Sequence, residues 1–179
     1  SARGRRLVTL PGEDIIRPTA DKVKGAIFSS IQFEIEGRHV LDMYAGSGAL
    51  GIEALSRGAE SCVFAEFNKK AVEIIKKNLG ACGFSDRAKV VNSDAVSYLK
   101  TTFEGFDIII ADPPYKSGLA LKTLNAAAQC AREGGIIVIE TAKEEELPER
   151  AGSFALAKHS VYSKTAVFIY RYDSQRTDG

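Results

Sequence analysis

The chain has 179 residues, of which 45% are apolar and 26% are charged, and its formal net charge is +1. This composition is too apolar for a disordered chain, and the length favours one domain over residues 1–179. A charge so close to zero means that any surface for nucleic acid must be a local basic patch.

The chain begins with a basic segment and ends with a polar one. Arg3, Arg5 and Arg6 precede the first acidic residue, Glu13, and residues 1–12 are interpreted as an N-terminal arm that can contact phosphates. Residues 173–179 are polar and are predicted to form a flexible tail.

Between these ends, apolar runs alternate with helical patterns. The helical patterns, with apolar residues on one face, cover 68–82, which Gly83 ends, and 119–131. The predicted strands are 38–44, 61–66, 88–92, 106–111 and 135–140. The last two runs are almost purely apolar, which is typical of strands buried on both faces of a parallel sheet. The alternation predicts a doubly wound α/β fold.

After residue 140 the alternation of predicted strands and helices ends. Residues 154–159 and 165–172 read as two strands joined by a short turn near 162–164. Such a hairpin would add an antiparallel edge to the parallel sheet.

A glycine-rich loop, 42–51 (DMYAGSGALG), follows the first predicted strand. Its glycines at 46, 48 and 51 allow tight turns and close approach of the backbone to a ligand. The same spacing fits the G-x-G-x-x-G pattern of dinucleotide sites, so the glycines alone leave NAD open. Asp42 at the strand end favours S-adenosylmethionine, because a carboxylate can bind an ammonium group but would repel a pyrophosphate.

Further acids follow the second and third strands. Glu66 ends the second strand, where it could accept both hydroxyls of a ribose, and Asp94 follows the third, where it could accept from an adenine amine. Each could equally be a helix cap or a turn residue. The carboxyl ends of parallel strands meet in one crevice, so three acids after three strands favour a ligand site.

The segment Asp112-Pro113-Pro114-Tyr115 directly follows the fourth predicted strand. Two prolines fix two φ angles and supply no N–H donor, so the Pro113 carbonyl can be a rigid acceptor beside the Asp112 carboxylate. Tyr115 offers a flat face for stacking. Two acceptors and a flat face suit the exocyclic amine of a nucleobase, held for methyl transfer by positioning and electrostatics.

Three segments, Asp42–Ala59 (DMYAGSGALGIEALSRGA), Asp112–Tyr115 (DPPY) and Arg17–Lys24 (RPTADKVK), resemble the RsmD family, and the similarity runs from about Gly4 to Tyr172. The resemblance implies a class I, Rossmann-like, S-adenosylmethionine-dependent methyltransferase. Its sheet would have seven strands, mostly parallel, with one antiparallel strand near the edge. The expected reaction is methylation of the N2 amine of a guanine in 16S rRNA, with 16S rRNA or the small ribosomal subunit as partner.

The resemblance also implies roles for particular residues. Asp112 to Tyr115 would face the guanine as the catalytic motif. Phosphates of the RNA would be held by Arg3, Arg5, Arg6, Lys22 and Lys116. S-adenosylmethionine would be held by Asp42, Ala45, Gly46, Ser47, Gly48, Glu66, Phe67, Asp94, Ala95, Arg17 and Thr19.

Several alternatives stay open at this point. The four-residue motif would serve adenine N6 as readily as guanine N2, so a DNA or RNA adenine-N6 methyltransferase is one. A non-catalytic RNA-binding assembly factor with a vestigial loop is a second, and an NAD-dependent oxidoreductase is a third. The absence of a separate target-recognition segment argues against a DNA enzyme. The intact acids and the intact four-residue motif argue against an assembly factor that has lost its cofactor site.

The remaining expectations concern metal, membrane and assembly. The three cysteines, Cys62, Cys82 and Cys130, form no Cys-x-x-Cys pair, and the two histidines fit no metal-ligand spacing. We therefore expect reduced thiols and no metal. No apolar run approaches the roughly 18 residues of a membrane span and no signal peptide is visible, so we expect a cytoplasmic protein, and a monomer.

Overall fold

A computed structural model describes residues 4–11 and 18–175, except for the side chains of Pro18 and Thr19. Its sheet has the strand order β3-β2-β1-β4-β5-β8-β7-β6. The strands are β1 (His39–Met43), β2 (Ser61–Glu66), β3 (Ala88–Asn92), β4 (Phe106–Ala111), β5 (Ala131–Ala142), β6 (Arg150–Ala151), β7 (Phe154–Tyr162) and β8 (Thr165–Tyr172). The helices are α1 (Pro18–Ile31), α2 (Ala49–Ser56), α3 (Lys69–Cys82), α4 (Ala95–Thr101) and α5 (Leu119–Cys130), with a short 3-10 helix at Ser85–Arg87.

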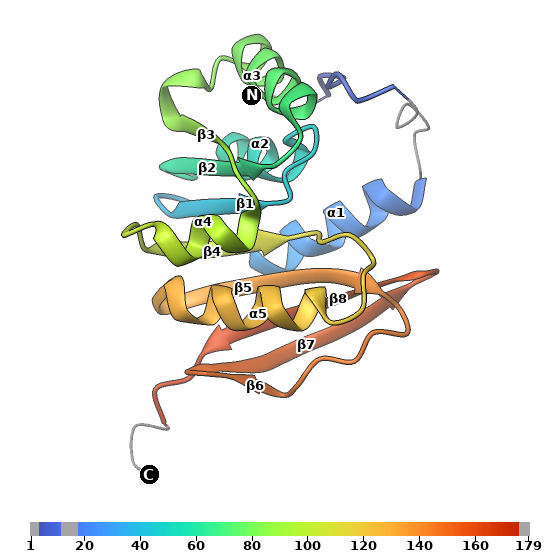
Figure 1. Cartoon of the computed structure of the whole chain (residues 1–179), viewed down its shortest axis with the longest axis vertical. Helices are drawn as coiled ribbons and strands as arrows, with labels where there is room; N and C mark the ends of the chain where they lie inside the picture. Colours follow the sequence, from blue (N-terminus) through green and yellow to red (C-terminus); the bar gives the residue numbers. More distant parts are fainter. Residues whose placement is uncertain (1–3, 12–17, 176–179) are drawn as a thin grey trace.

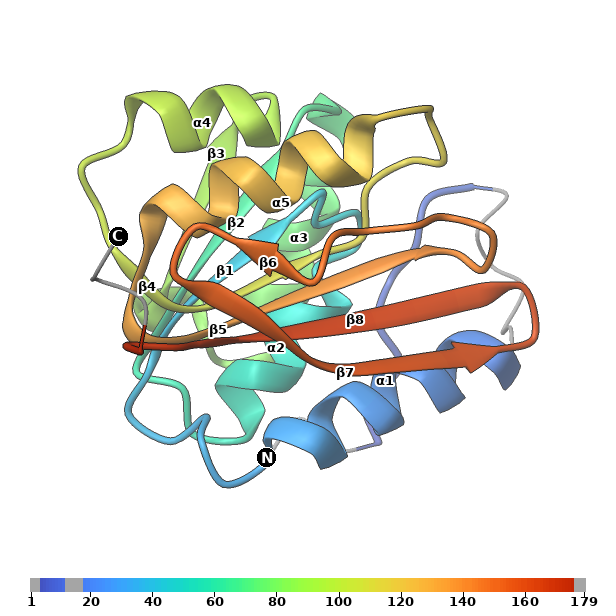
Figure 2. The same cartoon turned by 90° about the horizontal axis from the view of Figure 1, so that it is seen from below.

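The sheet separates two layers of helices (Figures 1 and 2). Apolar residues of α1, α2 and α3 form one buried cluster with one face of the strands, and those of α4 and α5 form a second cluster with the other face. Figure 2 shows α4 and α5 above the sheet and α1 and α2 below it. Because residues alternate between faces along a strand, each central strand supplies both clusters, which is why these strands are apolar throughout.

The predicted strands and helices are largely confirmed. β2, β3 and β4 have the predicted bounds, and the 68–82 helix is α3, with Asn68 as its N-cap and Gly83 as its C-cap. The first five strands pair in parallel, and β8 runs antiparallel to β5, as expected for this fold.

The predicted strand count was wrong. The sheet of the described residues has eight strands because β6 adds a two-residue strand beside β7, antiparallel to it. A strand of two residues has no periodicity from which it could be predicted. It nevertheless lies close to the chain end: Asp173, the first residue of the predicted tail, forms an ion pair with Arg150 of this strand at 2.7 Å.

Helix α1 was not predicted as an element, and its C-terminal end is tied to the late hairpin. Val23, Ile27 and Ile31 are buried on one of its faces. Lys158 of β7 donates to the Ser30 hydroxyl at 2.9 Å, and Arg171 of β8 is paired with Glu34. These contacts fix the helix against the sheet. No helix in the described part of the chain is long and apolar enough to cross a membrane.

Candidate functional site

The glycine-rich loop joins β1 to α2 through several residues with positive φ. Tyr44, Gly46 and Gly48 have φ values of 59°, 58° and 84°. The Ala45 N–H donates to the Ala65 carbonyl of β2 at 3.1 Å, and the Gly48 N–H donates to the Ala45 carbonyl at 2.8 Å. A Cβ atom on Gly46 would meet no atom within 4 Å. The backbone at Gly46 therefore faces open space, which a ligand can approach closely.

Asp42 is buried beneath this loop. Its Oδ2 accepts a hydrogen bond from the Gly51 N–H at 2.9 Å, so in this structure it holds the first turn of α2. Burial raises its pKa well above the ordinary value, and the nearby charges of Asp112 and Glu66 raise it further. The loop therefore lies in an acidic environment, which favours a cationic ligand over an anionic one.

Glu66 at the end of β2 connects the glycine-rich loop to the next turn. Its Oε1 accepts from the Gly46 N–H at 2.9 Å, and its Oε2 accepts from the Asn68 N–H at 2.8 Å. Asn92 of β3 donates to the carbonyls of Glu66 and Phe67 at 3.0 and 2.8 Å. The ends of three strands are thus joined by hydrogen bonds centred on the predicted ribose acceptor.

A hollow of about 660 Å³ lies beside Glu66, between the β2–α3 and β3–α4 turns. Phe67 at its wall is 77% exposed. Asp94 caps α4, because its Oδ2 accepts from the Ser97 N–H at 2.9 Å, and Ala95 begins the helix as a buried residue. The lining residues are Phe67, Asn68, Lys69, Asn92, Ser93, Asp94 and Ser97. The hollow brings together residues predicted for a nucleoside, whose roles stay predictions, and the bond to Ser97 confirms the cap interpretation of Asp94.

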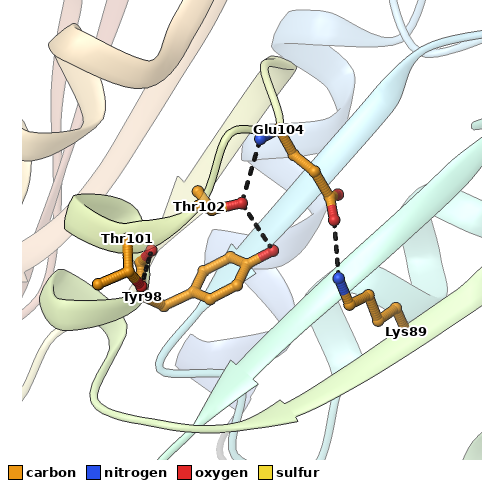
Figure 3. Close-up of polar contacts among 5 residues, drawn as sticks. All are labelled: Lys89, Tyr98, Thr101, Thr102 and Glu104. Atoms are coloured by element: carbon orange, nitrogen blue, oxygen red, sulfur yellow. Dashed lines mark hydrogen bonds and ion pairs between the residues drawn. The ribbon is translucent and has the colours of Figure 1, made fainter.

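The far end of α4 is held by a polar network (Figure 3). The Thr102 hydroxyl donates to the Tyr98 hydroxyl at 3.4 Å and accepts from the Glu104 N–H at 3.1 Å. Lys89 of β3 pairs with Glu104 at 2.7 Å, and this contact raises the pKa of Lys89. With its first turn capped and its last turn tied to β3, the helix places Asp94 beside the hollow.

The segment Asp112-Pro113-Pro114-Tyr115 leaves β4 at the carboxyl edge of the sheet. Pro113 is buried, and Tyr115 is 66% exposed, which leaves its ring available to a ligand. The Pro114 carbonyl accepts from the Lys116 N–H at 2.8 Å and closes a tight turn. Within the described residues, no donor is bonded to the Pro113 carbonyl or to the Asp112 carboxylate. Both predicted acceptors of the motif are therefore free of donors from residues 4–11 and 18–175.

Asp112 lies beside a second acid, Glu140 of β5, which the sequence analysis did not single out. Asp112 is open to solvent on one side, yet the atoms crowded around its carboxyl remove enough hydration to raise its pKa to about 6. Desolvation, with the charge of Asp112 as a smaller cause, raises the pKa of Glu140 to about 8. When two carboxyls lie this close, ionisation of one disfavours ionisation of the other. The pair therefore keeps a proton to a higher pH than a separate carboxyl would.

This pair predicts a pH dependence of stability. The pKa of Glu140 rises from 4.5 in its ordinary state to about 8, so the folded chain binds more protons than the unfolded chain between these values, and stability falls as the pH rises through this range. In Glu140→Gln that fall should be smaller. Thermal melts from pH 5 to 9 test this, with Glu133→Gln, an exposed site on the same strand, as the control. Parallel curves for Glu140→Gln and wild type would contradict it.

The residues predicted to bind RNA come from three separate segments (Figure 1). Arg5 and Arg6 are exposed on the arm, where Arg5 donates to the Ala81 carbonyl of α3. Lys22 is exposed on α1, and Lys116 is exposed just after the motif. Arg3, Arg17 and the side chain of Thr19 lie outside the described residues, so their predicted roles stay predictions.

Asn78 of α3 is a buried side chain that the sequence analysis missed. Its Oδ1 accepts from the Val8 N–H at 2.8 Å, and its Nδ2 donates to the carbonyls of Val8 and Ser47, each at 2.9 Å. One amide group therefore holds the arm and the glycine-rich loop together. Its position among the apolar residues of an amphipathic helix was the available signal, because a buried amide needs partners.

Tyr44 is a second residue that the sequence analysis left without a role. Its hydroxyl hydrogen-bonds to the Thr123 hydroxyl of α5 at 2.8 Å. Burial raises its pKa, and the charge of Asp94 contributes as well. The loop is thereby anchored to the helix layer on the opposite face of the sheet from α2.

Comparisons with known proteins agree with this geometry. Residues 1–171 match the family described as "Conserved hypothetical protein 95". A Bacillus subtilis protein named "Putative rRNA methyltransferase YlbH" is 42% identical over 176 residues, which cover 96% of this chain and 95% of that protein. The Escherichia coli "Ribosomal RNA small subunit methyltransferase D" is 33% identical, over 97% of this chain and 87% of that protein.

Solved structures with a similar fold are also described as methyltransferases. The structure described as "Putative methyltransferase yhhF from Escherichia coli" superposes with a TM-score of 0.85 at 32% identity, over 97% of this chain and 94% of that one. The Thermus thermophilus 16S rRNA N2 G1207 methyltransferase (RsmC), in complex with AdoMet and guanosine, superposes with a TM-score of 0.74 at 26% identity, over 89% of this chain and 44% of that one. The chain therefore belongs to the family described as conserved hypothetical protein 95, which is the RsmD family of methyltransferases.

Proposed function

We propose that this protein transfers a methyl group from S-adenosylmethionine to the exocyclic N2 amine of a guanine in 16S rRNA. The observation that carries the proposal is the pair of open acceptors, the Asp112 carboxylate and the Pro113 carbonyl, on the same sheet edge as the glycine-rich loop. A site with two fixed acceptors suits a group with two N–H donors.

The residues present fit S-adenosylmethionine better than NAD. Asp42, Glu66 and Asp112 lie close enough at this edge to disfavour each other's ionisation, so a bound cation would stabilise their ionised forms and a pyrophosphate would oppose them. Asp42 and the loop from Gly46 to Gly48 would hold the methionine part, and Glu66 would accept from the ribose. Asp94 and Phe67 would hold the adenine in the hollow. The cofactor would supply a methyl group that its sulfonium has already activated.

The remaining chemical problem lies with the methyl acceptor. The lone pair of an exocyclic amine is delocalised into the ring, which makes the nitrogen a poor nucleophile. Acceptors at Asp112 and Pro113 would each take one N–H hydrogen bond and favour a more tetrahedral nitrogen. The motif would thereby act by positioning and electrostatics, with loss of the proton following attack.

The relatives support an rRNA substrate. Proteins covering nearly the whole of this chain are named rRNA methyltransferases, one of them for the small subunit. The structural neighbour bound to AdoMet and guanosine is named for N2 methylation of a guanine. These names supply the choice of guanine N2 over adenine N6, which the four-residue motif alone leaves open.

The direct test is methyl transfer to small subunits that lack the modification. Purified protein, isotope-labelled S-adenosylmethionine and subunits from a strain without the enzyme should give one labelled N2-methylguanine in 16S rRNA, mapped by mass spectrometry. Binding of S-adenosylhomocysteine but not NAD, measured by calorimetry, checks the cofactor. N6-methyladenine as the product would contradict the proposed substrate.

Tyr115 gives a prediction about the nucleobase. An enzyme that acts on a base takes it out of its stack, and stacking on an aromatic ring recovers about 1–3 kcal/mol. The ring of Tyr115 is 66% exposed, so Tyr115→Ala should raise the KM for the RNA substrate by about tenfold, and Tyr115→Phe should retain most of the affinity.

Steady-state methyl transfer with both variants measures this difference. Phe103→Ala removes a fully exposed ring away from the motif and should leave the KM unchanged. An unchanged KM in Tyr115→Ala would rule out stacking on this residue.

A further inference from the structure

Glu140 is a titratable side chain at the candidate site that the proposed chemistry does not use. It lies near the carboxyl end of β5, the strand next to β4 in the sheet, and it is half-buried. Within the described part of the chain, no side chain or backbone group is hydrogen-bonded to its carboxyl group. A strand residue with a partly buried, unpaired carboxyl has no evident structural use.

The strand register places Glu140 beside the amine-presenting motif. Ala111 of β4 pairs with Ile139 of β5 in parallel, so Asp112 and Glu140 are the next residues along neighbouring strands. Adjacent strands lie about 4.8 Å apart. The two acids therefore lie side by side near the carboxyl edge of the sheet.

The two side chains also share a face. Ala111 and Ile139 belong to the apolar cluster under α4 and α5, whereas Ile110 and Val138 belong to the cluster with α1, α2 and α3. Since side chains alternate along a strand, Glu140 lies on the face of Val138, and the β4 pattern puts Asp112 on the same face. The charge of Asp112 is felt at Glu140, which agrees with this placement.

Guanine carries a donor beside the amine that would be methylated. Its edge presents N1–H next to the N2 amine, whereas a base with an unprotonated N1 presents a lone pair there. A carboxylate accepts from N1–H and repels a lone pair at the same position. Two carboxyls held side by side match the adjacent donors of a guanine edge.

We propose that Glu140 selects guanine at this site, by accepting the N1–H hydrogen bond while Asp112 and Pro113 accept from the N2 amine. This inference rests on the proposed function, because it assigns a residue to the recognition of its substrate. Burial raises the pKa of Glu140 to about 8, so the ionised form that accepts from N1–H predominates above that pH, where the assays are run.

The test compares guanine with 2-aminopurine at the target position. 2-Aminopurine keeps the exocyclic N2 amine but has a lone pair at N1. Each base is placed in 16S rRNA through a ligated synthetic fragment, and the RNA is reconstituted into small subunits. Wild-type protein should methylate guanine with a kcat/KM about 10- to 100-fold above that for 2-aminopurine, the value of a hydrogen bond to a charged group.

Substitution of Glu140 should remove this preference. In Glu140→Ala, kcat/KM for guanine should fall by about 10- to 100-fold, and kcat/KM for 2-aminopurine should stay within about threefold of wild type. Glu140→Gln keeps an uncharged acceptor oxygen, so its loss on guanine should be smaller than that of Glu140→Ala. If Glu140 had a merely structural role, its substitution would lower kcat/KM equally for both substrates. Glu133→Gln, on the exposed part of β5, should behave as wild type. Unchanged affinity for S-adenosylhomocysteine and an undiminished melting temperature show that the variants are folded.

The outcomes separate this inference from the proposed function. Wild-type methylation of guanine with equal turnover of 2-aminopurine, or a full guanine rate in both Glu140 variants, would overturn the role of Glu140 and leave the proposed function standing. A wild-type protein that leaves the guanine unmethylated would overturn both.

Discussion

Replacing Asp112 by alanine should lower kcat for methyl transfer by about 100- to 1,000-fold, which is the usual cost of removing one preorganised hydrogen-bond partner from a reacting group. Asp112 is bonded to no donor within the described residues, so the substitution breaks no hydrogen bond that the structure shows. The fold should therefore survive. A lower rate would then show that the amine is held less well, and not that the protein is unfolded.

Asp112→Asn distinguishes two roles for this side chain. An amide keeps one acceptor oxygen but cannot take up a proton at neutral pH, so an acceptor role predicts a smaller loss, about tenfold, in Asp112→Asn. A role as general base predicts that Asp112→Asn is as inactive as Asp112→Ala. Comparison of the two variants therefore decides how the motif acts.

Single-turnover methyl transfer to small subunits measures the chemical step for both variants. Asp86→Ala, which removes an exposed aspartate from the 3-10 helix, serves as the control and should keep the wild-type rate. Binding of S-adenosylhomocysteine should stay within a few fold in all three proteins. Near wild-type turnover in Asp112→Ala would exclude the motif as the amine-holding group.

The parts of the fold that the sequence predicted are those whose burial leaves a periodic signal. β4 is apolar at nearly every position because helices cover both faces of the sheet, and α3 shows its apolar face at helical spacing. α1 was missed because Gly25 lowers its helix propensity and its first half is mostly polar, even though Val23, Ile27 and Ile31 are buried at i, i+4 and i+8. Packing of this apolar face against the sheet and the hairpin stabilises the helix, and that packing cannot be seen in the local sequence.

The candidate site was predictable to the extent that its residues follow strand ends. Asp42 and Glu66 lie at the ends of predicted strands and Asp94 and Asp112 follow such strands, and the common edge of the sheet brings them together. Glu140 was not found, although it too lies near a strand end. Glu140 matters because it lies beside Asp112, and that proximity depends on the pairing of β4 with β5. No local sequence pattern predicts which strands pair.

Asp94 illustrates a different limit of sequence reasoning. As a helix cap it satisfies a backbone N–H of α4, and as a residue of the hollow it can still meet a ligand. From the sequence alone, these two roles are competing interpretations. A carboxylate has two oxygens, so one side chain can serve the helix and a ligand at once.

Gly51 provides the largest predicted effect on stability. It lies in the first turn of α2, where a Cβ atom would be 2.3 Å from Cε1 of Phe64 and 2.8 Å from Sγ of Cys62. Both neighbours are fully buried side chains of β2, so neither can move aside easily. Gly51→Ala should lower the free energy of unfolding by about 3 kcal/mol, at the upper end of the cost of overpacking.

For a chain of this length that cost corresponds to a fall of about 6–12 °C in melting temperature. Gly80→Ala is the matched control, because Gly80 is an exposed helical residue whose added Cβ would meet nothing within 4 Å. It should raise stability by about 0.5–1 kcal/mol. Opposite signs for one substitution at two helical glycines would isolate the contact with β2 as the cause, and a wild-type melting temperature in Gly51→Ala would contradict it.

The effect of Gly51→Ala should extend from stability to the ligand. The Gly51 N–H donates to Asp42, so a shift of α2 away from β2 would move the loop that Gly46 and Gly48 form. At a temperature where Gly51→Ala is still folded, affinity for S-adenosylhomocysteine should fall, whereas Gly80→Ala should bind as wild type. Weaker binding by the folded variant would connect the close packing of α2 on β2 to the shape of the cofactor loop, which is the physical reason that a glycine is needed at the third position of this motif.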